Sequence, residues 1–246
     1  MQPTVAPPLV ETVGLTLAAA GRTLVRGLDW QARPGERWCV LGRNAAGKST
    51  LLRALAGLPV PLRDGVVRWL GRAQGDWSPA DAAAVRAFAP QQAHDRFSIT
   101  VQRLLELAVC VPGVADAAEV LGALDATSLA DRDVLQLSGG ERQRVALAQC
   151  ALQGAPLMLL DEPIAFQDPA HQRQIARWLR TLEGHCLVFS AHDVNWLTGV
   201  ATHVIALQED GRWKAGPVEQ MVNAAGLEAI YGCRWRDVGG VWVVVD

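Results

Sequence analysis

The first forty residues of the chain alternate between apolar and polar or small positions. Alternation places every second side chain on one face, which is typical of a half-buried β-strand. The apolar members of this pattern are Leu15, Leu17, Leu24, Leu28 and Trp30. Gly21 and the Arg-Pro-Gly sequence at 33–35 interrupt it where turns are expected. We therefore predict short β-strands here, and the patterns at 204–207 and 241–245 predict strands near the C-terminus.

Three continuous apolar runs stand out from this alternation. They occupy residues 38–41, 157–160 and 186–189, and such runs are typical of parallel strands buried on both faces. The first run leads into a glycine-rich turn, and residues 49–56 then show helical spacing that ends at Gly57. The order predicted for this part of the chain is strand, glycine-rich loop, helix.

The middle of the chain is predicted to be helical. Between residues 98 and 152, apolar residues recur three and four positions apart, which is the spacing of one helix face. Pro112-Gly113 interrupts the pattern, which resumes at 114–124 and 141–152, and a further helix is predicted at 172–182. The whole pattern indicates an α/β fold, with a parallel-sheet core, a helical insertion and β-rich ends.

The composition excludes several kinds of protein. With 246 residues, 50% of them apolar and 20% charged, the chain can bury a core and is too apolar for intrinsic disorder. Its 23 basic and 25 acidic side chains give a net charge of -2. A nucleic-acid-binding protein needs a clear basic excess, so no nucleic-acid partner is expected. The same balance argues against electrostatic attachment to a membrane surface.

No segment predicts a membrane span or a secretory signal. The longest uncharged run, at 145–160, is too short and too polar to cross a bilayer, which takes about 20 apolar residues. The N-terminal region carries no basic stretch before its apolar residues. The five cysteines are widely spaced without a CxxC pair, as expected of free thiols in a reducing compartment. We expect a soluble chain that stays in the cytoplasm.

Residues 42–49, Gly-Arg-Asn-Ala-Ala-Gly-Lys-Ser, fit the phosphate-loop pattern GxxxxGK[ST] between the predicted strand and helix. In such a loop, backbone N–H groups and the helix N-terminus surround phosphate oxygens, and a hydroxyl binds Mg²⁺. Lysine occurs only at Lys48 and Lys214, against 21 arginines, which indicates that Lys48 needs a compact point charge. Ala45 stands where many such loops have glycine, and its Cβ is costly if the backbone needs a positive φ.

Asp161 and Glu162 directly follow the apolar run at 157–160. The carboxyl ends of parallel strands are where α/β proteins bind ligands. In phosphate-loop proteins an aspartate at this place holds Mg²⁺, and we expect Glu162 to polarise an attacking water. The sequence therefore predicts a nucleotide-hydrolysing site.

Residues 137–141, Leu-Ser-Gly-Gly-Glu, resemble the LSGGQ-type signature of ATP-binding cassette (ABC) ATPases. Pro90-Gln91 resembles the Q-loop of that family, with Gln92 as the alternative glutamine. Asp168 resembles the D-loop aspartate, and His192 resembles the switch histidine. Almost the whole chain is covered, and the motifs occur in the family's order.

The resemblance implies a P-loop NTPase (RecA-like) core, an N-terminal antiparallel β subdomain and an inserted helical subdomain. We interpret residues 1–246 as one nucleotide-binding domain, with 1–91 and 153–246 forming the core and 92–152 the helical signature subdomain. The implied cofactors are ATP and Mg²⁺. The implied phosphate-binding residues are Gly42, Arg43, Asn44, Ala45, Ala46, Gly47, Lys48, Ser49 and Thr50.

The resemblance also implies roles for the other motifs. Glu162 would be the general base, His192 would contact the γ-phosphate, and Ser49, Gln91 and Asp161 would hold Mg²⁺. In a head-to-tail homodimer, the partner's ATP would be contacted by Ser138, Gly139 and Gly140. Transmembrane permease subunits would bind the dimer at the cytoplasmic face of the plasma membrane, and a substrate-binding protein would act with them indirectly.

Two departures from the family pattern affect details of the site. The D-loop, commonly Ser-Ala-Leu-Asp, reads Ala-Phe-Gln-Asp at 165–168, so a hydroxyl contact across the dimer is missing. Near residues 15–24, where relatives place an adenine-stacking aromatic, the chain has Leu-Ala-Ala-Ala-Gly, and no Tyr, Phe or Trp precedes Trp30.

The end of the chain, from His-Asp-Val-Asn at 192–195 to Tyr231-Gly232, resembles the ATPases of iron-siderophore, haem and cobalamin importers. Two alternatives stay open within the family, an exporter ATPase and a non-transport ABC ATPase of translation or DNA repair. A phosphate-loop kinase or GTPase is disfavoured by the signature and by His192. The resemblance implies that the permease and the binding protein, and not the ATPase subunit, select the transported substrate.

Overall fold

A computed structural model of the chain describes residues 7–93, 97–111, 113 and 115–245. Its N-terminal part is an antiparallel sheet of four strands in the order β2-β1-β4-β5. Alternate burial along β1 and β2 agrees with the predicted strands, although both are long rather than short. The strands are β1 (Val10–Ala19), β2 (Arg22–Ala32), β4 (Leu62–Trp69) and β5 (Arg72–Ala73).

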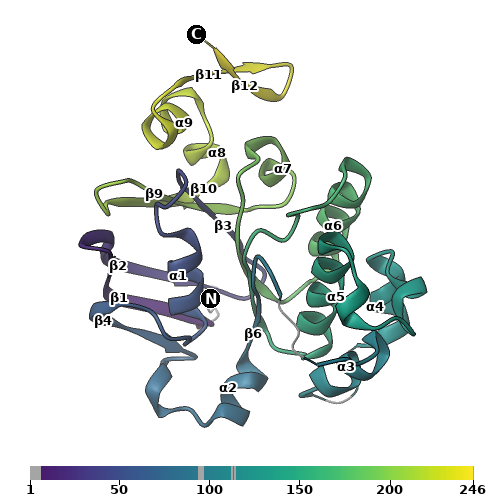
Figure 1. The fold of residues 1–246 in the computed structure, drawn as a ribbon. Helices are drawn as coiled ribbons and strands as arrows, with labels where there is room; N and C mark the ends of the chain where they lie inside the picture. Colours follow the sequence, from purple (N-terminus) through teal and green to yellow (C-terminus); the bar gives the residue numbers. More distant parts are fainter. Residues whose placement is uncertain (1–6, 94–96, 112, 114, 246) are drawn as a thin grey trace, which may run out of the picture.

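The second sheet forms the core of the molecule (Figure 1). Its six strands lie in the order β10-β9-β3-β8-β7-β6, and all neighbouring pairs are parallel except β10 with β9. The three apolar runs of the sequence are its strands β3, β7 and β8, as predicted. The strands are β3 (Arg37–Leu41), β6 (Arg86–Ala89), β7 (Leu157–Leu160), β8 (Cys186–Ser190), β9 (His203–Leu207) and β10 (Trp213–Pro217).

Successive side chains of the core strands enter two different hydrophobic clusters, one on each face of the sheet. In β7, Met158 and Leu160 pack with the helical layer, whereas Leu157 and Leu159 pack with α1 and the antiparallel sheet. Burial on both faces explains why these strands read as continuous apolar runs.

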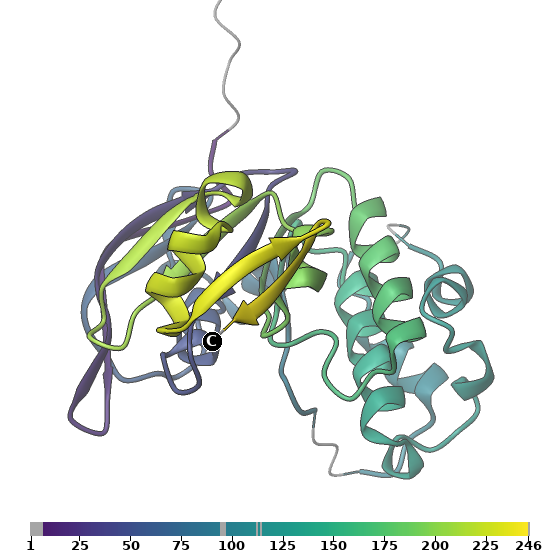
Figure 2. The same ribbon diagram turned by 90° about the horizontal axis from the view of Figure 1, so that it is seen from above.

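The helices divide between the two faces of the core sheet. In Figure 2 the teal and green helices lie on one side and the purple antiparallel sheet lies on the other. The α-helices are α1 (Lys48–Leu55), α2 (Pro79–Val85), α3 (Val101–Ala108), α4 (Ala117–Ala123), α5 (Gly139–Leu152), α6 (Pro169–Thr181), α7 (Val194–Thr198), α8 (Val218–Met221) and α9 (Ala224–Tyr231). The 3-10 turns are η1 (Gln74–Asp76), η2 (Thr127–Leu129) and η3 (Val134–Gln136).

Two helices, α4 and α6, start at other residues than predicted, because a capping aspartate sets where each begins. Helix α6 begins three residues before the predicted start because the Asp168 carboxylate accepts hydrogen bonds from the first-turn N–H groups. Asp116 caps α4 in the same way. Pro112 and Val114, which belong to predicted features, lie outside the described residues.

The C-terminal part carries a two-stranded sheet of β11 (Arg234–Val238) and β12 (Val241–Val245). None of the described helices is long and apolar enough to cross a membrane. The boundaries of the helical signature subdomain, placed at 91/92 and 152/153 from the sequence, stay a prediction. Helix α5 belongs to that subdomain by these boundaries, and it also packs on the core strand β6.

Candidate functional site

The phosphate-loop sequence connects the end of β3 to the start of α1. Gly47 precedes the helix with a φ of 104°, and a Cβ there would lie 2.9 Å from the Cβ of Leu24. A Cβ at Gly42 would lie 2.9 Å from the carbonyl oxygen of Leu207. Both motif glycines are therefore required by close packing. Ala45 has a φ of 60°, so the strain expected of a side chain at this position is present.

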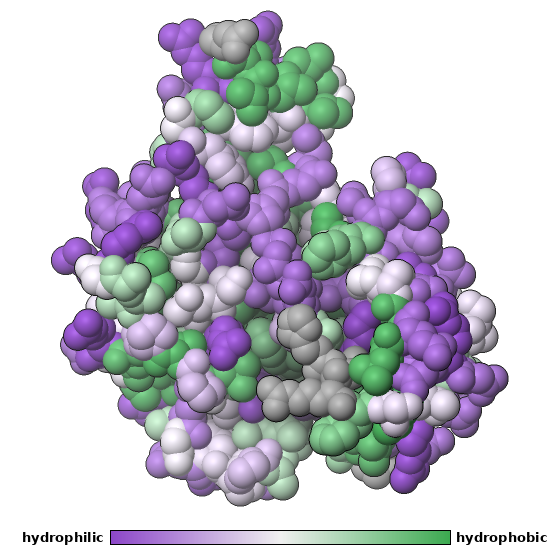
Figure 3. Space-filling view, viewed as in Figure 1, coloured by the Kyte–Doolittle hydropathy of each residue, from purple (hydrophilic) through white to green (hydrophobic). Residues whose placement is uncertain are grey.

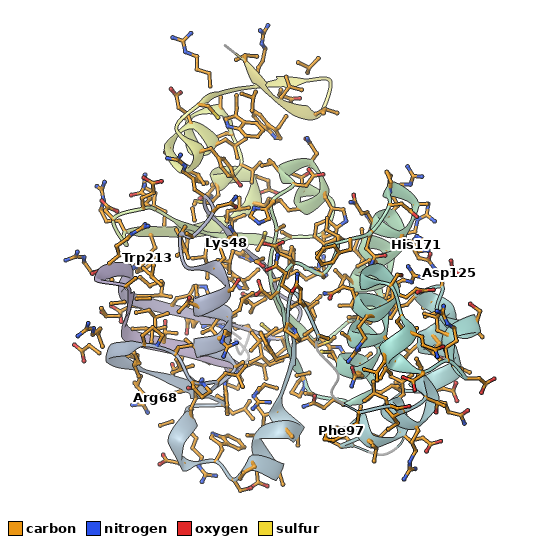
Figure 4. The ribbon with its side chains drawn as sticks, viewed as in Figure 1. Lys48, Arg68, Phe97, Asp125, His171 and Trp213 are labelled. Atoms are coloured by element: carbon orange, nitrogen blue, oxygen red, sulfur yellow. The ribbon has the colours of Figure 1, made fainter. Side chains whose placement is uncertain are left out.

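Lys48 lies under this loop at the centre of the molecule (Figure 4) and is 6% exposed. Its Nζ donates to the carbonyl oxygen of Gly42 at 2.9 Å and to that of Arg43 at 3.2 Å. Burial lowers the pKa of Lys48 below its ordinary value, while the nearby charges of Glu162 and Asp161 act in the opposite direction. The ammonium is thus held inside the loop by backbone carbonyls that a phosphate group could replace.

The carboxylate of Asp161 and the backbone of Glu162 are joined by a residue that sequence reasoning did not select. Ser190, the last residue of β8, donates from Oγ to Oδ1 of Asp161 at 2.6 Å. The same Oγ accepts a hydrogen bond from the backbone N–H of Glu162 at 2.9 Å. Asp161 is 4% exposed and Ser190 is fully buried, so this link is protected from water. The signal available in the sequence was a polar residue ending an apolar strand two positions before His192.

Glu162 contacts two of the other predicted site residues, Gln91 and His192. Its Oε2 accepts from Nε2 of Gln91 at 2.8 Å, and its Oε1 lies 2.5 Å from Nε2 of His192. The backbone of Glu162 has a φ of 50°, which is strained for a side chain of this size. The contacts with Gln91 and His192 hold the carboxylate between an amide and an imidazole. A carboxylate held in this way can accept a proton from a bound water.

A cleft of about 590 Å³ joins these groups to the phosphate loop. It runs from the site of Glu162, past the start of α1, to the turn between β1 and β2. Gln91 lies in this cleft, whereas Gln92 lines a smaller neighbouring cavity. The lining residues are Ala19, Ala20, Arg22, Leu24, Asn44, Ala45, Gly47, Lys48, Ser49, Thr50, Gln91, Glu162 and His192.

The signature sequence occupies a different place. Ser138 caps α5, accepting from the N–H of Glu141 at 3.3 Å, while its own N–H donates to the carboxylate of Glu141 at 2.7 Å. These hydrogen bonds lower the pKa of Glu141, and Arg132 at 2.7 Å also does so. Within the described chain, the lining of the cleft does not include Ser138, Gly139 or Gly140. The chain therefore does not bring its own signature to its own phosphate loop.

The unusual D-loop packs against the signature of the same chain. Gln167 donates from Nε2 to the carbonyl oxygen of Gly140 at 2.8 Å and accepts from Nη1 of Arg144 at 3.1 Å. A Cβ at Gly140 would lie 2.7 Å from the carbonyl oxygen of Phe166. The side chain that replaces the family's leucine thus adds polar contacts to the signature turn.

Asp168 is held at the other end of the D-loop. Its Oδ1 accepts from the N–H groups of Ala170 and His171, at 2.8 and 2.9 Å, and its Oδ2 lies 2.8 Å from Nδ1 of His171. These contacts lower the pKa of Asp168, with the backbone N–H of His171 as the largest cause. The second ring nitrogen of His171 lies 3.2 Å from Oδ2 of Asp125, beside it in Figure 4. His171, on α6, therefore connects the D-loop to the turn that follows α4.

The fold agrees with that of solved ABC proteins. A structure described as a metal-chelate type ABC transporter in an inward-facing conformation matches with a TM-score of 0.78 and 22% identity, over 98% of each chain. An ATP-binding subunit of an ABC transporter matches with a TM-score of 0.77 and 21% identity, over 89% of this chain and 94% of that one.

Sequence comparison is more specific. The chain is 39% identical to the hemin import ATP-binding protein of Streptomyces coelicolor, over 87% of this chain and 79% of the relative. It is 35% identical to the protein of that name from Pseudomonas aeruginosa, over 91% and 92% of the two chains. Residues 25–165 match the ABC transporter family. These matches, together with the phosphate loop and the carboxylates that follow β7, establish that the chain belongs to the ABC transporter family of ATP-binding proteins.

Proposed function

We propose that this chain is the ATP-hydrolysing subunit of an importer for haem or a related iron chelate. The observation that carries the hydrolytic role is the contact of Glu162 with both Gln91 and His192, in the cleft that also contains Lys48. The import role is supported by relatives named as hemin import ATP-binding proteins, which match most of this chain.

The phosphate loop would bind the triphosphate of ATP. Backbone N–H groups at the N-terminus of α1 favour phosphate oxygens. Lys48 would exchange its carbonyl partners, Gly42 and Arg43, for the β- and γ-phosphate oxygens. Since Lys48 is already desolvated, this exchange needs little further loss of water from the ammonium.

Glu162 would take the proton of the attacking water, because its carboxylate is the acceptor group fixed beside the phosphate loop. Gln91 and His192 orient that carboxylate from two sides. We propose that His192 would also donate toward the γ-phosphate once nucleotide fills the cleft. Ser190 would fix the backbone of Glu162 relative to the carboxylate of Asp161, because its hydroxyl bonds both groups.

The donor set around the phosphate loop fits Mg²⁺. A hydroxyl from Ser49, a carboxylate oxygen from Asp161 and an amide oxygen from Gln91 are the hard ligands that this ion prefers. Nε2 of Gln91 faces Glu162, so the amide atom left for a metal is Oε1. When bound, Mg²⁺ would neutralise charge on the phosphate oxygens.

A second copy of the chain would complete the site. The signature turn lies outside the cleft of its own chain, but presents the N-terminus of α5, which suits an anion. We propose that Ser138, Gly139 and Gly140 of each copy contact the ATP bound by the other. The D-loop, packed on the signature through Gln167, would then lie at the same interface.

The permease would bind beside α3. Exposed apolar side chains gather there, including Phe97 at 79%, Leu107 at 62% and Val109 at 43% exposure. Phe97 is labelled near the lower edge of the molecule in Figure 4, and Figure 3 shows hydrophobic residues over this corner. A groove of about 500 Å³ between β6, α3 and α5 lies next to them. Binding there would hold the subunit at the cytoplasmic face of the membrane.

The cargo is best tested with the complete transporter. The chain would be reconstituted with its permease and binding protein in vesicles, and uptake of haem, ferric siderophores and cobalamin would be compared. ATP-dependent uptake of haem supports the proposal. ATP-dependent release of cargo in the opposite direction, or ATPase activity that no permease stimulates, contradicts the importer assignment.

Ser190→Ala is expected to lower the turnover number of ATP hydrolysis by about 5- to 30-fold, equivalent to ~1–2 kcal/mol. The change leaves an oxygen of the buried Asp161 and the N–H of Glu162 without their shared partner. Steady-state phosphate release gives the turnover number and KM, and KM should change less. Ser128→Ala, at an exposed serine, is the matched control. Equal activity of the two variants would refute the positioning role of Ser190.

ATP and GTP are expected to be hydrolysed with similar kcat/KM. Ala19 and Ala20 line the cleft on the turn where relatives place an aromatic, so they provide no ring to stack on the base. Phosphate contacts do not distinguish the bases. Competition kinetics with both nucleotides measures the ratio, and Ala19→Tyr should tighten ATP binding. A hundredfold preference of the unmodified protein for ATP would show that another group reads adenine.

A further inference from the structure

The position of the nucleotide base in the cleft follows from the position of the phosphates. Lys48 and Ser49 fix the triphosphate at one end of the cleft, so the base must lie at the other. That end is formed by Ala19 at the end of β1, Ala20 in the turn that follows, Arg22 at the start of β2, and Leu24. Two of these side chains are single methyl groups. Leu24 is 8% exposed and packs against the backbone of Gly47, close to the phosphate loop.

Arg22 supplies the planar group at this end of the cleft. It is exposed, and its Nη2 donates to the carbonyl oxygen of Glu209 at 3.4 Å. The carboxylate of Glu209 pairs with Arg43 of the phosphate loop at 2.9 Å. The turn between β9 and β10 therefore contacts both Arg22 and the phosphate loop. The long hydrogen bond of Arg22 leaves the guanidinium able to turn toward a ligand.

We propose that the guanidinium of Arg22 stacks on the nucleotide base and replaces the missing aromatic ring. The proposal rests on the nucleotide-hydrolysing role proposed above. An arginine guanidinium is flat, delocalised and weakly hydrated, and it stacks on π-systems. Because a stack contacts the face of the base rather than its edge groups, Arg22 favours purines over pyrimidines without separating ATP from GTP.

Equilibrium binding without Mg²⁺ tests the proposal. Excess EDTA prevents hydrolysis, and calorimetric titration of the full chain compares ATP, GTP, CTP and inorganic tripolyphosphate. We expect Arg22→Ala to weaken ATP and GTP by about tenfold and to leave tripolyphosphate unchanged. Arg22→Lys keeps the charge without the flat group and should resemble Arg22→Ala. Arg22→Tyr should restore purine binding to within about threefold of the unmodified protein.

Arg26→Ala is the matched control, since Arg26 is an exposed arginine on the same strand that is not among the residues lining the described cleft. Equal ATP affinity in Arg22→Ala and Arg26→Ala would overturn the proposal. It would also be overturned if Arg22→Lys retained full affinity or Arg22→Ala weakened tripolyphosphate as much as ATP, because Arg22 would then act as a charge on the phosphates. Failure of the underlying function has a separate signature, which is that Lys48→Ala leaves tripolyphosphate binding intact.

Discussion

Glu162→Gln is expected to bind ATP and to hydrolyse it about 10²- to 10⁴-fold more slowly than the unmodified protein. The amide has nearly the same shape as the carboxylate and keeps the site closed, but it cannot accept a proton from water. It also presents an N–H₂ group to one of its two partners, Gln91 or His192, both of which approach an acceptor oxygen in this structure. Phosphate release under single-turnover conditions measures the loss.

The same variant should accumulate an ATP-bound dimer on size-exclusion chromatography, because two intact signatures can close on nucleotide that is not consumed. Glu219→Gln changes an exposed carboxylate on α8 and serves as the control. Turnover by Glu162→Gln within a few-fold of the control would rule out the general-base role. A monomer that still fails to hydrolyse ATP would instead separate the chemical step from dimer closure.

Parts of the fold were predictable because a local pattern determines them. The apolar runs that became β3, β7 and β8 are buried on both faces, so each residue of these runs carries the signal. Strand β6 was missed because Arg-Ala-Phe-Ala has a single large apolar side chain, and its place in the sheet is set by pairing with β7. Strand β4 was missed because its first half is exposed and charged.

The same distinction applies to the site. The loop around Lys48 and the carboxylates after β7 lie in contiguous motifs, so their residue types and spacing were sufficient to select them. Ser190 and Gln167 act through partners 29 and 27 residues away, Asp161 and Gly140, and no local pattern marks such pairs. Arg22 carries no signal of its own in the sequence, since the family pattern places an aromatic ring in that segment. The sequence predicts strain at Ala45 if the loop needs a positive φ there, and the observed φ is 60°.

Lys48→Arg is expected to be nearly as damaging as Lys48→Ala, with both variants losing at least about 10²-fold in ATP hydrolysis. Nζ of Lys48 lies within 3.2 Å of two loop carbonyls, and the side chain is 6% exposed. A guanidinium is wider and flat, so it cannot occupy this position without moving the loop. The loop has little room to move, because a Cβ added at Gly42 or Gly47 would already lie 2.9 Å from a neighbouring atom.

The chain provides its own control for this substitution. Lys214, its second lysine, is exposed on β10, so Lys214→Arg should leave hydrolysis and ATP affinity unchanged. Phosphate release and calorimetric ATP binding would be measured for Lys48→Arg, Lys48→Ala and Lys214→Arg together. If Lys48→Arg retained most of the activity, the loop would accept a flat cation. The scarcity of lysine in this arginine-rich chain would then say nothing about the phosphate site. Loss in both Lys48 variants, with thermal stability maintained, would mean that the site selects a compact charge rather than a positive charge of any shape.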